Sequence, residues 1–269
     1  MEVKIGLLQY SVYRGERQNN EEIIETYMEE AKRERPQVIV LPEMWTTGYD
    51  LENLQKNKNV EETNGTAALA KLIKWAKETG AYIVGGSTAV SRSCYEPPQF
   101  ANTMYVVNQE GEKILTYEKA HLFRLMDEDK YMVAGQQCGN FMLDRIPCGA
   151  IICYDLRFPE WVRKTMLANK AQVLFVVAQW PKSRLKHWIT LLQARAIENQ
   201  CFVIACNRNG SDNERSMFAG HSMVIDPWGD LIGDKKEETG WLWAEIEVAK
   251  VEKVRKRIPV FTDRRTDLY

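Results

Sequence analysis

The chain has 269 residues, of which 45% are hydrophobic and 27% charged, a balance typical of a globular protein with a large core. Its net charge of −1 argues against nucleic acid or an acidic membrane as a partner. The chain begins directly with strand-like residues, so we expect neither a signal peptide nor a membrane-spanning segment.

The cysteine and histidine content points away from a metal centre. There are six cysteines and three histidines, and no two cysteines form a C-x-x-C pair. We therefore expect no zinc site. Cysteines spread through apolar segments of a chain this long indicate a reducing cytoplasm rather than a disulfide scaffold. The cysteines are Cys94, Cys138, Cys148, Cys153, Cys201 and Cys206.

Strand and helix patterns alternate from the start of the chain. Val3–Gln9 is predicted as a buried strand and Asn20–Arg33 as a helix, because the apolar residues of the second segment recur at helical spacing. Val38–Leu41 is a short apolar strand of the kind found inside a covered sheet. A helix over Thr66–Thr79, closed by a glycine, leads into a further strand at Tyr82–Gly85.

The middle of the chain combines a hairpin with a long polar connection. Asn102–Asn108 and Lys113–Glu118 are predicted to pair across a Glu-Gly turn. His121–Gln137 has no clear period and is long for a connection, which is often a sign of a functional loop. Gly139–Ile146 and Cys148–Cys153 are then predicted as strands.

The last third continues the alternation and defines the fold class. We find no linker and no repeat, so 1–269 is predicted to be one α/β domain. Two strongly apolar, mixed sheets are expected to pack face to face between outer helices, as an α-β-β-α sandwich. The predicted elements here are the helices Pro159–Asn169 and Leu185–Asn199 and the strands Val173–Ala178, Phe202–Ala205, His221–Asp226 and Trp241–Ile246.

Cys153 stands at the corner between an apolar strand and a helix that Pro159 opens. Glu160 falls in the first turn of that helix, where the positive end of the helix dipole favours an acid. A strand-to-helix corner can hold a nucleophile in place and present backbone N–H groups beside it. The alternative is a purely structural thiol, since free cysteine is among the residues most often buried.

Glu43 and Lys119 also stand just after predicted strands, Val38–Leu41 and Lys113–Glu118. In open α/β sheets, ligands bind at the carboxyl ends of strands. Taken alone, the two residues could be a loop acid and a solvated base. Together with Cys153 they place a carboxylate, an ammonium and a thiol at three strand ends, which predicts a common site.

These three groups form a workable set for acyl transfer. A thiol with an ordinary pKa of about 8.5 needs a nearby base or cation to react at neutral pH, and Glu43 can supply the base. Lys119 and the backbone N–H of Tyr154 can stabilise the oxyanion that forms when sulfur attacks a carbonyl. The glutamate can then protonate the leaving amine and activate the water that opens the thioester. This chemistry requires no metal or organic cofactor.

Three segments resemble the motif blocks of one enzyme superfamily. Leu41–Met44, Tyr117–Phe123 and Cys153–Glu160 resemble the glutamate, lysine and cysteine blocks of the carbon–nitrogen hydrolase (nitrilase) superfamily. The resemblance spans nearly the whole chain. It implies a Glu–Lys–Cys triad, an α-β-β-α sandwich, and a homodimer whose sheets stack into a larger layered assembly.

The same resemblance implies a fourth functional residue. Members of the superfamily carry a second glutamate between the lysine and cysteine blocks, which orients the lysine and assists the water. Glu128 is at the matching position. Asp127 and Asp129 are the competing acids.

A finer resemblance is to the omega-amidase branch. It is carried by Ala178–Pro181, His187-Trp188 and Gln193–Gln200, with Gln179 where the branch usually has asparagine. Omega-amidases hydrolyse the terminal amide of 2-oxo acids such as 2-oxoglutaramate. Trp180 is expected either to line the substrate pocket or to fill the core.

Arg157 also has two interpretations. It could bind the substrate carboxylate through two parallel hydrogen bonds, or pair structurally with Glu160 or Asp155. Residues 257–269 resemble the superfamily's C-terminal segment, which reaches across the dimer; a frayed terminus is the alternative. The pocket walls are expected from loops at residues 46–64, 91–100 and 124–137.

The leading hypothesis is a cysteine-dependent amidohydrolase that acts on a small carboxylated amide, as omega-amidases do. The nearest alternative is an N-carbamoyl amino acid or amine amidohydrolase. An alternative of another class is a non-catalytic binding or scaffold member of the fold. Loss of Glu43, Lys119 or Cys153 would mark such a protein, and all three are present.

Overall fold

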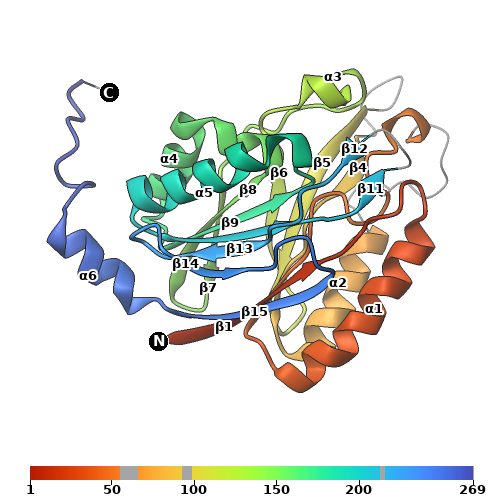
Figure 1. Cartoon of the computed structure of the whole chain (residues 1–269), viewed down its shortest axis with the longest axis horizontal. Helices are drawn as coiled ribbons and strands as arrows, with labels where there is room; N and C mark the ends of the chain where they lie inside the picture. Colours follow the sequence, from red (N-terminus) through yellow and green to blue (C-terminus); the bar gives the residue numbers. More distant parts are fainter. Residues whose placement is uncertain (55–65, 93–98, 213–215, 269) are drawn as a thin grey trace.

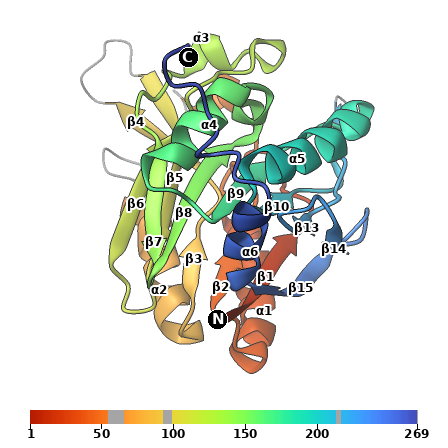
Figure 2. The same cartoon turned by 90° about the vertical axis from the view of Figure 1, so that its left-hand side faces the viewer.

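The computed structural model describes residues 1–54, 66–92, 99–212 and 216–268. Within these ranges two mixed β-sheets pack face to face, and helices cover both outer faces (Figures 1 and 2). The predicted α-β-β-α sandwich is confirmed. Cys94, Tyr269 and parts of two predicted wall loops, 55–64 and 93–98, lie outside the described residues.

The first sheet has seven strands in the order β15-β1-β2-β3-β5-β4, with β6 also paired to β5. Its centre is parallel, since β1 pairs with β2 and β2 with β3 in the same direction, whereas the outer pairs are antiparallel. The strands are β1 (Glu2–Gln9), β2 (Val38–Val40), β3 (Tyr82–Val84), β4 (Thr88–Arg92), β5 (Gln99–Val107), β6 (Lys113–Glu118) and β15 (Gly240–Glu247).

The second sheet has six strands in the order β14-β13-β10-β9-β8-β7. Here β8, β9 and β10 are parallel and form the centre. The strands are β7 (Gly139–Leu143), β8 (Ile146–Ile152), β9 (Val173–Ala178), β10 (Phe202–Asn207), β13 (Met223–Ile225) and β14 (Leu231–Asp234). A two-stranded ribbon, β11 (Ser211–Asp212) and β12 (Ser216–Met217), stands apart.

Two helices cover each sheet. In Figure 1, α1 and α2 lie together against the first sheet, while α4 and α5 lie against the second. The helices are α1 (Arg17–Glu34), α2 (Thr66–Thr79), α3 (Glu128–Tyr131), α4 (Pro159–Ala168), α5 (Leu185–Asn199) and α6 (Ala249–Arg257). Short 3₁₀ helices are η1 (Leu51–Asn53), η2 (Arg124–Met126), η3 (Cys153–Arg157) and η4 (Lys182–Arg184).

Strand β2 shows why these apolar runs form doubly covered strands. Val38 and Val40 belong to the core between the two sheets, whereas Ile39 belongs to the core beneath α1 and α2. Successive side chains of a strand point to opposite faces, so a strand buried on both sides must be apolar throughout. The sheet therefore fixes the position of whatever polar residue follows β2.

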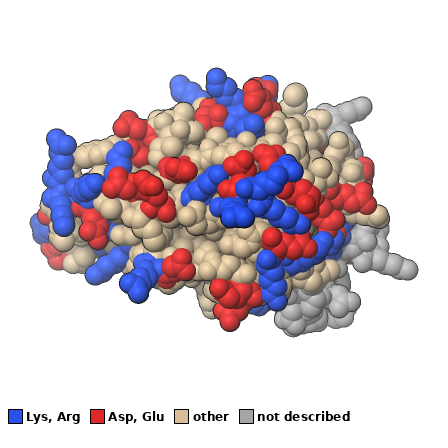
Figure 3. All heavy atoms as spheres, turned by 90° about the horizontal axis from the view of Figure 1, so that it is seen from below, with Lys and Arg blue, Asp and Glu red and all other residues tan. Residues whose placement is uncertain are grey.

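The face of the molecule seen in Figure 3 has no large region in which all charged side chains have the same sign. Basic and acidic side chains are interspersed there, as the near-zero net charge predicts. Within the described ranges no helix is both long and apolar enough to cross a bilayer.

Candidate active site

Three strand ends meet at one buried point. Glu43 follows β2, Lys119 follows β6, and Cys153 follows β8. Glu43 and Lys119 are 0% exposed and Cys153 is 6% exposed. With Glu128, also 0% exposed, they form what we call the acid–lysine–cysteine cluster. The structure thus brings together the residues that the sequence predicted at strand ends.

Cys153 occupies a strained corner. It begins η3 with φ +46°, a left-handed conformation that costs a non-glycine residue free energy and persists only where the surroundings enforce it. The buried carboxylate of Asp155 provides such support. It accepts the backbone N–H of Ile152 at 3.1 Å and the hydroxyl of Tyr117 at 2.7 Å. It also accepts the backbone N–H of His121 at 2.9 Å. These contacts tie the corner to the end of β6.

The Glu43 carboxylate is surrounded by hydrogen-bond donors. Its Oε1 accepts Tyr49 Oη at 2.7 Å, Asn102 Nδ2 at 2.9 Å and Lys119 Nζ at 2.9 Å. Its Oε2 accepts the backbone N–H of Gln179 at 2.8 Å. A buried carboxylate is stable only when it is paired and hydrogen-bonded, and this one is both.

Lys119 lies between two carboxylates. Its Nζ is 2.9 Å from Glu43 Oε1 and 2.8 Å from Glu128 Oε2. Burial disfavours the ammonium, but the Glu128 and Glu43 charges outweigh it and raise the pKa of Lys119 above its usual value. Burial raises the pKa of Glu128, with Lys119 opposing and Glu43 adding to the effect. The lysine is therefore a fixed positive charge at neutral pH.

Glu128, and not its neighbours, enters the site. Besides Lys119, its Oε2 accepts the backbone N–H of Phe123 at 2.5 Å. Asp127 and Asp129 are exposed and face Lys130 at 2.8 Å and Arg124 at 3.8 Å instead. Of the three acids among which the sequence left the choice open, only Glu128 lies in the cluster.

The Cys153 thiol lies within electrostatic range of Glu43, Lys119 and Glu128. Burial raises the pKa of Cys153 well above its ordinary value, and the Glu43 charge raises it further, while Lys119 opposes both. In the resting protein the sulfur therefore holds its proton. A carboxylate that could take that proton, Glu43, lies within electrostatic range of it.

Tyr154 lies in the first turn of η3. The N–H groups of a first turn have no acceptor within their own helix. The Tyr154 ring packs against Phe123 and Phe158, with ring centroids 4.8 and 5.2 Å away.

Arg157 and Trp180 lie together beside the cluster. The guanidinium of Arg157 is 4.6 Å from the centroid of the Trp180 ring and 3.3 Å from His187 Nδ1. Among the described residues it has no ion pair with Glu160 or Asp155, the structural alternative that the sequence left open. Trp180 is 2% exposed, so most of its ring fills the core, beneath the arginine.

Sequence reasoning missed two side chains of the site, Tyr49 and Asn102. Tyr49 Oη donates to Glu43 and lies 3.0 Å from Glu128 Oε1, and Asn102 Nδ2 bridges the same two carboxylates at 2.9 and 3.2 Å. Tyr49 lies in a predicted wall loop, but only as one residue among many. Asn102 lies inside β5, where an asparagine within a mostly buried strand was the available signal.

Cavities flank the cluster on two sides. One of about 480 Å³ is lined by Phe123, Tyr154 and Phe158. Another of about 210 Å³ is lined by Tyr49, Arg14 and Asp212. None of the four cluster residues lines either cavity, but Tyr154 follows Cys153 in the chain and Tyr49 donates to Glu43.

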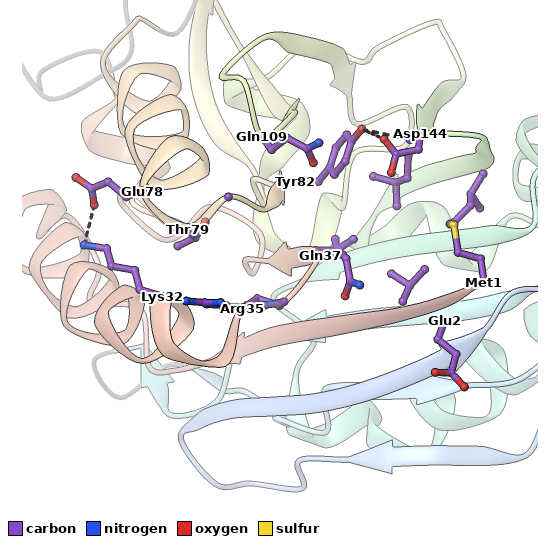
Figure 4. Close-up of a pocket in the computed structure, with 16 residues that line it drawn as sticks. Met1, Glu2, Lys32, Arg35, Gln37, Glu78, Thr79, Tyr82, Gln109 and Asp144 are labelled. Carbon is purple, nitrogen blue, oxygen red and sulfur yellow. Dashed lines mark hydrogen bonds and ion pairs between the residues drawn. The ribbon is translucent and has the colours of Figure 1, made fainter.

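A further cavity, of about 630 Å³, lies at the opposite ends of the strands (Figure 4). It is lined by residues at the beginnings of β1, β2 and β3, whereas the cluster lies beyond strand carboxyl ends. Two pairs of its polar groups bond to each other, Lys32 with Glu78 at 3.1 Å and Tyr82 with Asp144 at 2.8 Å. It is remote from the chemistry.

A buried acid–lysine–cysteine cluster within an α-β-β-α sandwich defines a class of hydrolase, and comparison with known proteins identifies it. A family model described as carbon-nitrogen hydrolase matches residues 4–256. The chain belongs to this family and is a hydrolase of carbon–nitrogen bonds other than peptide bonds.

Individual relatives narrow the branch. The chain is 47% identical to a 2-oxoglutaramate amidase of Bacillus subtilis (strain 168), over 100% of both chains. It is 37% identical to an omega-amidase of Yersinia enterocolitica, over 84% of this chain and 83% of the relative. The omega-amidase-like branch predicted from sequence is confirmed.

The fold comparison agrees. A CN-hydrolase superfamily protein from Xanthomonas campestris, solved with an arsenic adduct in its active site, superposes with a TM-score of 0.90. The two share 29% sequence identity, and the match covers 99% of this chain and 98% of that one. The non-catalytic scaffold alternative finds no support in these relatives.

Proposed function

We propose that this protein is a cysteine-dependent amidase that releases ammonia from the terminal amide of a small 2-oxo acid, such as 2-oxoglutaramate, through a thioester. One observation carries the proposal: a buried lysine lies 2.8–2.9 Å from two carboxylates, and a thiol at a strand-to-helix corner lies within electrostatic range of all three. The amidase names of the relatives support the choice of substrate.

In the acylation step, Glu43 takes the proton of the Cys153 thiol as the sulfur attacks the amide carbon. The carbonyl oxygen becomes an oxyanion, which the Lys119 ammonium and the backbone N–H of Tyr154 stabilise. Glu43 then gives the proton to the leaving nitrogen. The carbon–nitrogen bond breaks, ammonia departs, and a thioester remains on the sulfur.

In the deacylation step, Glu43 takes a proton from water as the water oxygen attacks the thioester. Lys119 and Tyr154 again stabilise the oxyanion, and Glu128 keeps the lysine in place and assists the water. The carbon–sulfur bond breaks, the carboxylic acid departs, and the proton returns to sulfur. Atoms and charges balance without a cofactor.

The substrate carboxylate needs a cation beside the nucleophile, and Arg157 suits this role. It has no carboxylate partner among the described residues, and its charge lies within electrostatic range of Cys153. Burial lowers the pKa of Arg157 from its usual value, yet the group stays protonated at neutral pH. Trp180 holds the guanidinium from one side.

Three further expectations are part of the proposal. Residues 1–269 form one functional domain, the protein works as a homodimer, and residues 257–269 lie at the dimer interface. The protein acts in the cytoplasm, consistent with free thiols at all five cysteines that the structure describes.

A turnover screen tests the substrate assignment. Ammonia release is compared for 2-oxoglutaramate, the same monoamide lacking the 2-oxo group, an N-carbamoyl amino acid and a nitrile. We expect the highest kcat/KM for 2-oxoglutaramate. A higher value for the N-carbamoyl compound would favour the alternative amidohydrolase.

The Cys153→Ala variant tests the mechanism. We expect it to fold normally and to lose all turnover, whereas wild-type protein quenched during turnover carries an acyl mass on the peptide containing Cys153. Cys138→Ala, which removes a half-buried thiol elsewhere, is the matched control and should keep full activity. Turnover by the Cys153→Ala variant would contradict the thioester route.

A further inference from the structure

The two oxygens of the Glu43 carboxylate have different surroundings. Oε1 accepts three donors, whereas a carboxylate oxygen offers about two lone pairs, so Oε1 has no room for another. Oε2 accepts the backbone N–H of Gln179. Because Oε1 is fully occupied, Oε2 is the oxygen left to receive the proton of the Cys153 thiol, which lies within electrostatic range of Glu43. The position of Oε2 is therefore set by Gln179.

The side chain of Gln179 holds the backbone of the same glutamate. Its Nε2 donates to the carbonyl oxygens of Glu43 at 2.7 Å and Met44 at 3.5 Å. Met44 has φ +49°, so the chain is strained directly after Glu43 and needs outside support to stay there. Gln179 thus restrains Glu43 at the carboxylate and at the main chain.

This arrangement works only if the Gln179 amide points in one direction. Its nitrogen must face the two carbonyl groups, because its oxygen would repel them. Arg208 Nη1 lies 3.3 Å from Gln179 Oε1. A guanidinium has donors and no acceptor, so it accepts only the orientation in which the amide oxygen faces Arg208.

Arg208 is 0% exposed, and several contacts fix the position of its guanidinium. Its Nε donates to the carbonyl of Asn209 and its Nη2 to that of Ser211, both at 3.1 Å. The ring centroid of Phe218 lies 4.2 Å from the guanidinium carbon. Burial lowers the pKa of Arg208 to about 10, so it remains charged at neutral pH. It forms no ion pair within the described part of the chain, although Asp212 lies within electrostatic range.

We propose that Arg208 is a positioning residue for the amidase reaction: it orients the Gln179 amide, and Gln179 places Oε2 of Glu43 to take the thiol proton. This rests on the proposed role of Glu43 as base. It adds two buried side chains, Arg208 and Gln179, to the four residues of the cluster.

A double-mutant cycle tests the proposal. Arg208→Met removes the guanidinium, and Gln179→Leu removes the amide but keeps the backbone N–H. We expect each variant to lower kcat by about 10- to 100-fold with little change in KM. The acidic limb of the kcat/KM profile should move to higher pH, because a base whose donors are displaced is protonated more easily. The double variant should be no worse than the poorer single variant.

Arg255→Met is the matched control. Arg255 also stacks on a phenylalanine, Phe261 at 4.7 Å, and donates to backbone carbonyls, but it belongs to α6, which contributes no residue to the cluster. It should lower the Tm and leave the acidic limb unchanged. If Arg208→Met does not fold, Arg208→Lys, which keeps the charge and loses the planar fork, replaces it in the cycle.

The outcomes separate this proposal from the proposed function. Independent, multiplicative losses in the cycle, or an unmoved acidic limb in both single variants, would overturn the role of Arg208. Glu43→Gln is measured alongside. If that variant keeps turnover, the proposed function fails; if it loses turnover while the cycle is additive, only the role of Arg208 fails.

Discussion

At the scale of single residues, Cys153 combines two features that are rarely found together. Its position beside a carboxylate suits a nucleophile, but burial and the Glu43 charge keep its proton in place. Many reactive cysteines are instead thiolates stabilised by a cation. In the proposed mechanism the thiolate forms only as the carboxylate takes the proton, so acid and thiol act as one unit.

Alkylation of the Glu43→Gln variant tests this interpretation. If Cys153 ionised without giving its proton to Glu43, loss of the neighbouring negative charge would lower the pKa of the thiol, raise the thiolate fraction and speed its reaction. Because we expect proton transfer to Glu43, iodoacetamide should instead modify Cys153 at least 10-fold more slowly in the variant at pH 7. Peptide mass spectrometry measures the rate, with Cys138 as the internal control. Faster modification would contradict the general-base role.

The pairing of Lys119 with two carboxylates makes a second prediction. Lys119→Met leaves two carboxylates buried together without a cation, which costs about 3–5 kcal/mol. Glu128→Gln leaves a neutral pair of Lys119 and Glu43 and removes the carboxyl group whose pKa burial has raised. Both variants should lose activity, but only Lys119→Met should lower the Tm by roughly 10 °C. Equal Tm values would mean that the lysine is not the charge that stabilises the cluster.

At the scale of elements, η3 depends on Asp155. The carboxylate accepts from the backbone of Ile152, from Tyr117 and from His121. Asp155→Asn replaces one acceptor oxygen with a donor that faces other donors, at a cost of about 1–3 kcal/mol. We expect kcat to fall more than 10-fold, since the backbone at Cys153 loses its support, together with a lower Tm.

Asp144→Asn is the control for that variant. Asp144 also accepts a tyrosine hydroxyl, that of Tyr82 at 2.8 Å, but it lies on an exposed turn. It should change the free energy of unfolding by less than about 0.5 kcal/mol and leave kcat unaffected. An active Asp155→Asn enzyme with a normal Tm would show that η3 holds its shape without the carboxylate.

Most helices and strands could be predicted because a pattern of apolar residues along the sequence marks each of them. The bounds of α2, α5, β6 and β9 match the predicted ones, since apolar periodicity and sharp polar ends mark them. The ribbon β11–β12 and strands β4 and β14 were missed. Leu231 and Ile232 of β14 are exposed, so no buried alternation marks that strand. The predicted strand Gly139–Ile146 ends at Leu143, because Asp144 turns the chain with φ +50°.

At the scale of the whole molecule, the sandwich decides which residues meet. Glu43, Lys119 and Cys153 could be predicted because each marks the end of its own strand. Gln179 and Arg208 could not, because their contacts join the ends of β9 and β10 to β2 in the other sheet. That contact depends on how the two sheets face each other, which no local pattern encodes. The contacts of Gln179 and Arg208 therefore depend on tertiary packing. Glu43, Lys119 and Cys153, in contrast, are marked by the local sequence.

The C-terminal tail carries the last prediction, at the level of assembly. Its first part is anchored: Phe261 lies under Arg163 and Arg255, and Gln200 Nε2 donates to the carbonyl of Ile258 at 2.6 Å. Beyond this anchor the tail leaves the body of the protein, and Leu268 is 69% exposed (Figure 1). An exposed apolar end on an extended segment suits contact with a second copy, as proposed above.

Deleting residues 263–269 should therefore weaken the dimer while leaving the monomer folded, because the anchor at Phe261 remains. Light scattering over a concentration series measures the mass, and we expect the deletion to raise the dissociation constant at least 10-fold. A variant with the same seven residues replaced by glycine and serine is the control for length, and should dissociate as readily as the deletion. An unchanged dimer in both variants would place the interface elsewhere on the molecule.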